Sequence, residues 1–236
     1  MKIYRLLFLA ALMGLLGASW PFSWIVSPQN REAFGSQAWI QKQIHIIKAQ
    51  AGNINDHVLR LSLIAYVNTY KKGLSTSKSL LTIIDYSKPS SEKRLWVVDL
   101  AKGRTLFHTW VSHGKNSGGV NPTSFSNTHS SLKSSIGVFV TDKSYFGGNG
   151  YSLRLRGLER GINDNAYHRN IVVHGAWYVN PDNIRKHGQI GRSWGCPAVS
   201  QSLAKPLIDT IKDRTVVFAY YPDRHWLRNS QFLAST

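Results

Sequence analysis

Two residues with complementary chemistry lie in the C-terminal half of the chain, His174 and Cys196. A cysteine attacks as its thiolate, and near neutral pH it needs a base or a nearby cation to lose its proton. His174 ends the apolar run Ile171-Val172-Val173 and is followed by Gly175. A strand at this position would deliver the imidazole to a cleft, and the glycine would permit a tight turn. If the fold brings the two side chains together, they form an activated nucleophile.

The residues before the cysteine extend this hypothesis. The segment reads Gly191-Arg192-Ser193-Trp194-Gly195-Cys196. Backbone N–H groups near Gly195 are candidate donors to an oxyanion. Arg192 is a candidate to hold a substrate carboxylate in a bidentate grip. The alternative interpretation is a turn with a small apolar residue, in which Cys196 is buried and inert.

Histidine and tryptophan side chains elsewhere in the chain are further candidates for the site. His113 lies in a Gly- and Ser-rich loop, where it either lines the cleft or is an ordinary polar loop residue. Trp177 and Trp194 are the best candidates among the tryptophans for cleft walls. The remaining histidines lack metal-ligand spacing, and there is no His-Glu-x-x-His motif, so we expect no metal and no other cofactor.

Composition restricts the class of protein. The chain has 236 residues with a net charge of +17, and 42% of it is hydrophobic, which argues against global disorder. One cysteine cannot form an intramolecular disulfide. The excess positive charge predicts an anionic partner, but it is spread along the chain rather than concentrated in an arm, so we expect no nucleic acid.

The N-terminus predicts export. Lys2 and Arg5 precede an uncharged run from Leu6 to Ala18, which has the length of a signal-peptide core and is short for a membrane span of about 20 residues. Residues 1–18 are therefore predicted to be a signal peptide, with an uncleaved anchor as the alternative. Either would place the bulk of the chain in the periplasm or cell envelope.

The elements that must position His174 and Cys196 follow from the periodicity. Residues 31–50 and a segment from the N-cap Asn55 to Gly73 carry apolar residues at steps of three and four, which predicts two helices. From about residue 80, β-branched and aromatic runs predict strands: Leu81–Tyr86, Leu95–Leu100, Thr105–Val111, Ile136–Thr141, Ile171–His174 and Thr215–Tyr221. One late helix is expected at about Pro206–Lys212. The sequence thus predicts a helical region at 19–79, a mainly β (α+β) domain at 80–222 and a tail at 223–236.

At these residues the sequence resembles the L,D-transpeptidase (YkuD-like) catalytic domain, in a divergent branch. That family carries His-Gly, a variable stretch and Ser-x-Gly-Cys, which are matched by His174-Gly175 and Ser193-Trp194-Gly195-Cys196. The resemblance covers roughly residues 57–221. It implies a β-sandwich or barrel with N-terminal helices. Two departures are evident: Trp194 stands where many members have histidine, and Pro197 follows the cysteine where many have an arginine close by.

The resemblance also implies roles. Cys196 would be the nucleophile, His174 the general base, Gly175 the carbonyl that orients the imidazole, and Gly195 part of the oxyanion site. Contacts to substrate would come from Arg192, Ser193, Trp194, Arg169 and His113, with Arg192 or Arg169 taking the donor carboxylate. The implied partner is the tetrapeptide stem of peptidoglycan, and association with anionic envelope surfaces is expected.

Three alternatives remain open from the sequence. The same site with water as acceptor would make an L,D-carboxypeptidase. A cysteine peptidase of the NlpC or sortase type is disfavoured by the order and spacing of Cys and His. A non-catalytic, basic wall-binding domain would leave Cys196 merely buried.

Overall fold

The computed structural model describes residues 33–236 except residue 77 and residues 235–236. The predicted signal peptide lies outside the described residues. Within the described part, no helix is both long enough and apolar enough to cross a bilayer.

Two capped helices open the described chain. Helix α1 (Gln37–Lys48) begins at Ser36, whose hydroxyl accepts from the Trp39 N–H at 3.1 Å. Helix α2 (Asp56–Lys71) begins at Asn55, whose side chain accepts from the first free N–H groups of the helix. These side chains satisfy backbone donors that have no partner inside the helix. The prediction of Asn55 as the N-cap is therefore confirmed.

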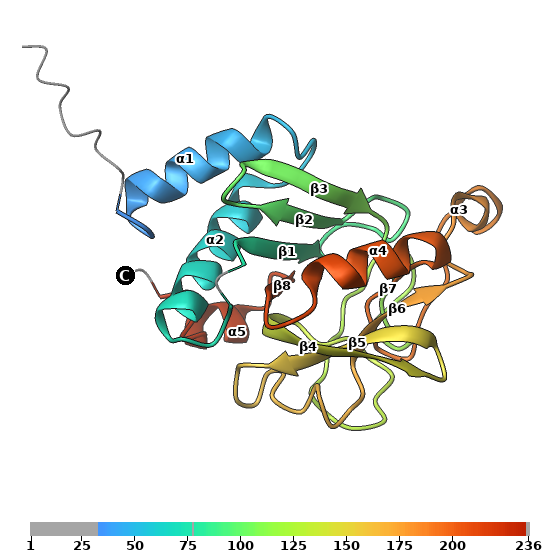
Figure 1. The fold of residues 1–236 in the computed structure, drawn as a ribbon. Helices are drawn as coiled ribbons and strands as arrows, with labels where there is room; N and C mark the ends of the chain where they lie inside the picture. Colours follow the sequence, from blue (N-terminus) through green and yellow to red (C-terminus); the bar gives the residue numbers. More distant parts are fainter. Residues whose placement is uncertain (1–32, 77, 235–236) are drawn as a thin grey trace, which may run out of the picture. The chain divides into compact units, whose positions relative to one another are not determined.

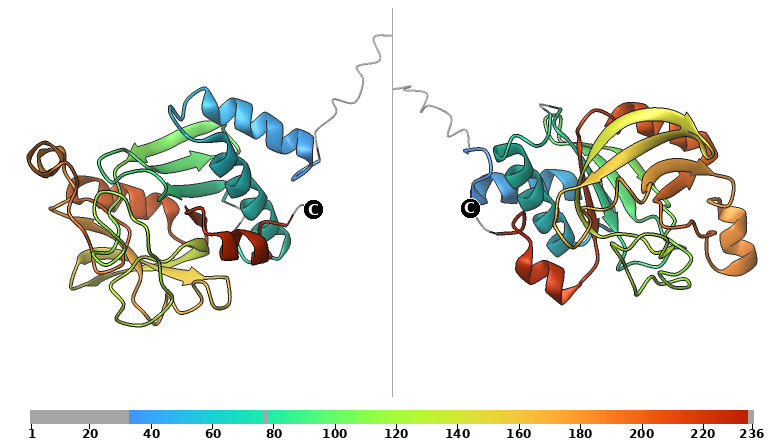
Figure 2. Two further views of the ribbon diagram at one scale, coloured as in Figure 1. Left: turned by 180° about the vertical axis from the view of Figure 1, so that it is seen from behind. Right: turned by 90° about the horizontal axis from the view of Figure 1, so that it is seen from below.

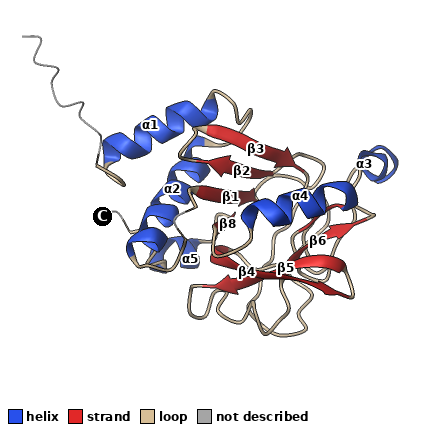
Figure 3. Cartoon of the chain, viewed as in Figure 1, coloured by secondary structure: helices blue, strands red, loops and turns tan. Residues whose placement is uncertain are grey.

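One mixed sheet of eight strands forms the body of the described chain (Figures 1 and 3). Its order is β3-β2-β1-β8-β4-β5-β6-β7, with parallel pairs only at β1–β8 and β6–β7. The sheet bends toward a barrel, so that β1–β3 and β4–β6 lie on opposite sides of helix α4 in Figure 1. The strands are β1 (Leu80–Asp85), β2 (Leu95–Asp99), β3 (Arg104–Thr109), β4 (Gly137–Gly147), β5 (Gly150–Gly157), β6 (Val172–Ala176), β7 (Ala198–Ser200) and β8 (Val216–Tyr220).

Helices pack against the sheet and share its core. Helix α4 (Gln201–Ile211) contacts β4 to β7 and buries four apolar side chains: Ala204, Leu207, Ile208 and Ile211. Helix α2 contacts β1 and β8, and α1 contacts β3 (Figure 2). Residues of α1 and α2 belong to the same buried apolar cluster as the strands. The Trp96 indole on β2 donates to the Ala51 carbonyl at 2.8 Å, which ties the helix connection to the sheet.

Two short helices complete the described chain, α3 (Pro181–His187) and α5 (Arg224–Asn229). Helix α5 is held by Trp226, which is fully buried and donates from Nε1 to both carboxylate oxygens of Glu159 at 3.0 Å. Glu159 also accepts from the Val138 N–H at 2.6 Å. One carboxylate thus joins the C-terminal segment to strand β4.

The predicted mainly β (α+β) fold with N-terminal helices is confirmed. Helix α4 begins at Gln201 and contains Pro206 in its interior, so the predicted start near Pro206 is wrong. Strands β5 and β7 and helices α3 and α5 were absent from the predicted elements. The domain boundaries at 18/19, 79/80 and 222/223 remain predictions.

Candidate active site

His174 lies on β6 between β5 and β7 and is only 5% exposed. Its Nδ1 is 2.9 Å from the Gly175 carbonyl oxygen. Because a carbonyl only accepts, this contact assigns the proton to Nδ1 and leaves Nε2 as the basic nitrogen. Burial lowers the pKa of His174 below the usual imidazole value, and the hydrogen bond to Gly175 opposes this shift. The imidazole is therefore neutral at pH 7.

Cys196 reaches the same part of the sheet through the parallel pairing of β6 and β7. His174 pairs with Ala198, so the cysteine stands two residues before the partner of the histidine. The Sγ atom is 3.3 Å from the Asn170 carbonyl oxygen, to which the thiol donates. Burial raises the pKa of the thiol, while the Val172 backbone N–H and the Arg169 charge lower it. Because its pKa is raised, the thiol is protonated at pH 7. Among the described residues no hydrogen bond joins Sγ to the imidazole of His174.

A tight turn fixes the backbone before the cysteine. The Ser193 hydroxyl donates to the Cys196 carbonyl at 2.6 Å and accepts from the Gly195 N–H at 3.1 Å. Gly195 has φ +130°, and a Cβ there would stand 2.9 Å from the Lys133 carbonyl oxygen. This position thus requires glycine for both its conformation and its space. The Gly195 N–H is already bonded, whereas the Cys196 N–H donates no hydrogen bond within the described chain.

Ser193 is 4% exposed, and its own backbone is bonded to the loop at residues 113–115. Its N–H donates to the His113 carbonyl at 2.9 Å, and its carbonyl accepts from the Lys115 N–H at 2.8 Å. The Ser134 hydroxyl adds a bond to the Gly195 carbonyl at 2.9 Å. The contacts of Ser193 therefore shape the turn.

Arg169 is bound to the loop at residues 126–135. Its Nη2 donates to the Lys133 carbonyl at 2.7 Å and to the Ser131 hydroxyl at 3.0 Å. Its Nη1 donates to the Ser135 hydroxyl at 2.6 Å and to the Ser126 carbonyl. The guanidinium thus holds the loop that touches Gly195, and its charge acts on Cys196 through space.

The prediction that His113 lines the cleft is wrong. His113 is fully buried, and its Nδ1 accepts from Arg94 Nη2 at 2.8 Å. Burial, together with the Arg94 charge, lowers the pKa of His113 to about 4. A Gly- and Ser-rich loop suggests exposure, but here the loop folds over the ring. His113 is a neutral link between Arg94 and the backbone of the loop.

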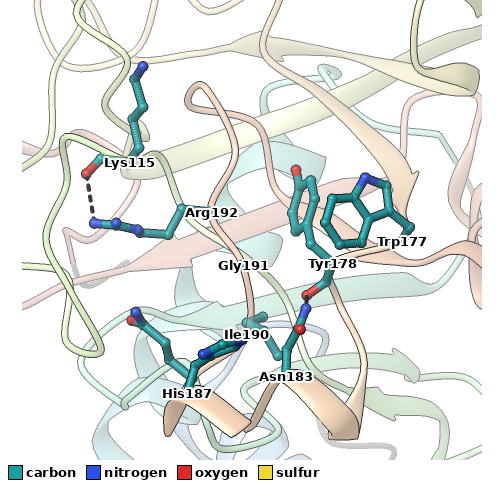
Figure 4. A pocket seen from close by; sticks show the side chains of 9 residues that line it. Lys115, Trp177, Tyr178, Asn183, His187, Ile190, Gly191 and Arg192 are labelled. Carbon is teal, nitrogen blue, oxygen red and sulfur yellow. Dashed lines mark hydrogen bonds between the residues drawn. The ribbon is translucent and has the colours of Figure 1, made fainter.

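Two cavities adjoin this site and share Trp177 and Tyr178 as a wall. The first has a volume of about 370 Å³ and is lined by His174, Gly175 and the turn between β4 and β5. The second has a volume of about 490 Å³ and contains Arg192 and Lys115 (Figure 4). Trp177 is 77% exposed, and Trp194, which lies 5.8 Å from the Lys115 ammonium, is 75% exposed. Both tryptophans thus offer an open ring face beside the site.

Sequence patterns missed three contributors, namely Arg94, Ser134 and Asn170. Arg94 is fully buried and donates to the Val111 and Lys88 carbonyls. Asn170 adopts φ +54°, which turns its carbonyl toward the thiol. None of them is marked by spacing, because each acts through a backbone atom or a long-range contact. Within the described chain, no group of three or more His, Cys, Asp or Glu side chains is arranged to hold a metal.

Comparison with known proteins places the chain in a family. The family model of the L,D-transpeptidase catalytic domain matches residues 50–220, which is most of the sequence. The chain belongs to the family of L,D-transpeptidase catalytic domains. The predicted family is thereby confirmed.

Solved structures show low similarity. An L,D-transpeptidase from Mycobacterium smegmatis is 15% identical, with 61% of this chain and 59% of that chain covered and a TM-score of 0.37. L,D-transpeptidase 1 from Mycobacterium tuberculosis is 15% identical, with 61% and 62% covered and a TM-score of 0.35. An L,D-transpeptidase from Stackebrandtia nassauensis is 13% identical, with 77% of each chain covered and a TM-score of 0.35.

The match to the first of these structures spans about three-fifths of its length. At such TM-scores the likeness adds nothing to the family assignment, which rests on the family model. No curated protein matches the chain.

Proposed function

We propose that this protein is a cysteine-dependent L,D-transpeptidase that acts on peptidoglycan tetrapeptide stems in the periplasm or cell envelope. The observation that carries the proposal is the pairing of β6 with β7, which brings the Gly195-Cys196 turn beside His174 in a chain of this family. The predicted signal peptide and the charge of +17 fit an exported protein whose polymer carries carboxylates.

Acylation begins from a neutral pair. Nε2 of His174 takes the proton from Cys196 as Sγ attacks the carbonyl carbon that precedes the terminal D-Ala. The developing oxyanion accepts a hydrogen bond from the Cys196 N–H, since the Gly195 N–H is occupied by Ser193. The imidazolium then gives its proton to the leaving amine, D-Ala departs, and a thioester remains on Sγ.

Deacylation reverses the roles. An amine of a second stem loses a proton to His174 and attacks the thioester, which forms a new peptide bond and returns the proton to the thiol. Water as the acceptor would give a tripeptide instead, so the same site also supports the carboxypeptidase alternative. Neutral His174 at pH 7 suits both steps, because a base must be unprotonated before it accepts.

Arg192 is our candidate for the donor carboxylate. Its Nη1 donates to the Lys115 carbonyl at 3.3 Å and to the Gly118 carbonyl at 3.0 Å, while the side chain stays exposed in the larger cavity. Arg169 is less suited, since four donor contacts already hold its guanidinium. We therefore assign Arg169 and Ser193 to positioning the turn, and leave Arg192 and Trp194 as the substrate contacts.

The test uses a defined disaccharide-tetrapeptide and mass spectrometry of the products. The wild-type protein should give 3–3 crosslinked dimers and release D-Ala. Cys196→Ala should lower turnover by at least ~10³-fold, and His174→Gln by ~10²–10⁴-fold. His45→Ala, which changes an exposed histidine on α1, is the matched control and should leave turnover unchanged.

Two outcomes would redirect the proposal. Tripeptide without crosslinked dimer would indicate hydrolysis. Unchanged product formation by Cys196→Ala would remove the cysteine from the mechanism, whereas absence of any product from the wild-type protein would favour a non-catalytic wall-binding domain.

A further inference from the structure

The larger cavity beside the site, which we call the Trp177 cavity, is lined by aromatic, amide and basic side chains. Its volume is about 490 Å³, and two of its lining residues, Trp177 and Tyr178, also line the His174 cavity. Figure 4 shows the two aromatic rings on one side and the Lys115 and Arg192 side chains on the other. No acidic side chain lines it. The full lining is Lys115, Trp177, Tyr178, Asn183, His187, Gln189, Ile190, Gly191 and Arg192.

Its framework is held by internal bonds. The Tyr178 carbonyl accepts from the Gly191 N–H at 2.9 Å and from Asn183 Nδ2 at 2.7 Å. A Cβ at Gly191 would stand 2.6 Å from the Tyr178 Cβ, so the chain passes against this residue as closely as only glycine allows. The cavity is therefore built by the fold before any ligand arrives.

The Trp177 indole has a free face. It meets Tyr178 edge to face, with centroids 5.8 Å apart and an interplanar angle of 79°, and it remains 77% exposed. An aromatic face carries negative quadrupole charge, which attracts the weakly positive C–H groups of a sugar ring. The exposed face of Trp177 also forms part of the lining of a concave site.

Polar groups around this face suit an amide-bearing sugar. Gln189 carries a buried Oε1 that has no hydrogen-bond partner within the described chain, and a ligand N–H would satisfy it. Asn183, which donates its Nδ2 to Tyr178, leaves Oδ1 as a further acceptor. Lys115 and Arg192 supply positive charge for carboxylates attached to the sugar.

We propose that the Trp177 cavity binds an N-acetylated hexosamine ring of the glycan strand, stacked on Trp177. This rests on the proposed function, because the sugar is taken to carry the peptide stem that enters the His174 cavity. Because Trp177 and Tyr178 line both cavities, one ligand that extends past these two residues can place its sugar in the Trp177 cavity and its peptide in the His174 cavity. The lysine and arginine then face the acidic groups of the stem.

The kinetic test compares a disaccharide-tetrapeptide with the same tetrapeptide lacking sugar. Trp177→Ala should raise KM about tenfold for the glycosylated substrate, about 1.4 kcal/mol, and should raise KM for the free peptide by a clearly smaller factor, since Trp177 also lines the cavity that the peptide enters. Tyr70→Ala is the matched control, since it removes another exposed aromatic ring, on α2. An equal rise in KM for both substrates, or no rise for either, would overturn the proposal.

A binding test separates this inference from the proposed function. Stem-free glycan strands are titrated into the Cys196→Ala protein and its Trp177→Ala derivative by calorimetry. We expect binding by the first and at least tenfold weaker binding by the second. Absence of glycan binding would overturn the inference even if crosslinking occurs. Glycan binding by the Cys196→Ala protein, combined with absence of product from the wild-type protein, would uphold the inference and reject the transpeptidase.

Discussion

At the scale of single residues, the protonation states of His174 and Cys196 determine the form from which the proposed acylation begins. The thiol donates to the Asn170 carbonyl, and burial raises its pKa, while burial lowers the pKa of the imidazole. Both shifts favour neutral forms. In the proposed mechanism the site therefore starts from a thiol and a neutral imidazole rather than from a thiolate–imidazolium pair, and His174 has to accept the proton during the attack itself.

The pH dependence of alkylation tests this state. A raised thiol pKa leaves little thiolate at pH 7, and the thiolate fraction grows as pH rises toward that pKa. We expect the rate of iodoacetamide labelling of the native protein to rise about tenfold per pH unit between about pH 6.5 and 8.5. Because Cys196 is the only cysteine in the chain, the label reports on it alone. A plateau of fast labelling across this range would demonstrate an ion pair and contradict the assignment.

At the scale of elements, the loop at residues 126–135 supports the cysteine turn. Arg169 binds this loop through four groups, and the Lys133 carbonyl within it lies against Gly195. A lysine at position 169 has no planar fork with which to reach those groups together. The loop and the turn are thus coupled through one guanidinium.

Arg169→Lys should therefore loosen the loop. We expect the free energy of unfolding to fall by about 1–3 kcal/mol, through lost charged hydrogen bonds to buried acceptors. Hydrogen exchange of residues 126–135 should accelerate, and kcat should fall more than KM rises. Arg185→Lys is the control, because Arg185 makes only an exposed pair with Asp182 on α3. Unchanged exchange in the loop would show that Arg169 does not hold it.

Elements with strong periodicity were predictable, and short ones were not. Helix α2 follows from its apolar spacing and from Asn55, and β6 follows from its apolar run. Strand β7 has three residues and helix α3 buries none, so neither leaves a periodic signal. His113 was misplaced because composition does not reveal that Arg94 holds it in the core. His174 and Cys196 could be nominated from their types, but only the β6–β7 register brings them together.

At the scale of the whole molecule, the segment predicted as a C-terminal tail contributes to the core. Trp226 on α5 is fully buried, contacts Phe218 with ring centroids 5.6 Å apart, and donates to Glu159. Phe232 is 1% exposed, and its carbonyl accepts from Asn68 of α2 at 2.9 Å. The end of the chain therefore joins α2 to the sheet.

Trp226→Ala should be strongly destabilising. Truncating a buried tryptophan leaves a cavity and removes one of the donors to the Glu159 carboxylate, and we expect a loss of about 3–5 kcal/mol in urea unfolding. Trp194→Ala, which truncates a tryptophan that is 75% exposed, should change stability by less than about 0.5 kcal/mol. Equal losses for the two variants would mean that the C-terminal segment does not pack as described.

The parallel pairing of β6 with β7 has a last consequence. Parallel neighbours require a crossover, and here it runs from Trp177 to Pro197 and carries α3 and most of the lining of the Trp177 cavity. His174 precedes this segment on β6, and Cys196 lies near its C-terminal end, in a turn that Ser193 and Ser134 hold. Ligand preference can therefore diverge or be engineered by exchanging residues 177–192, which leaves His174 and the Ser193–Cys196 turn of the proposed mechanism unchanged.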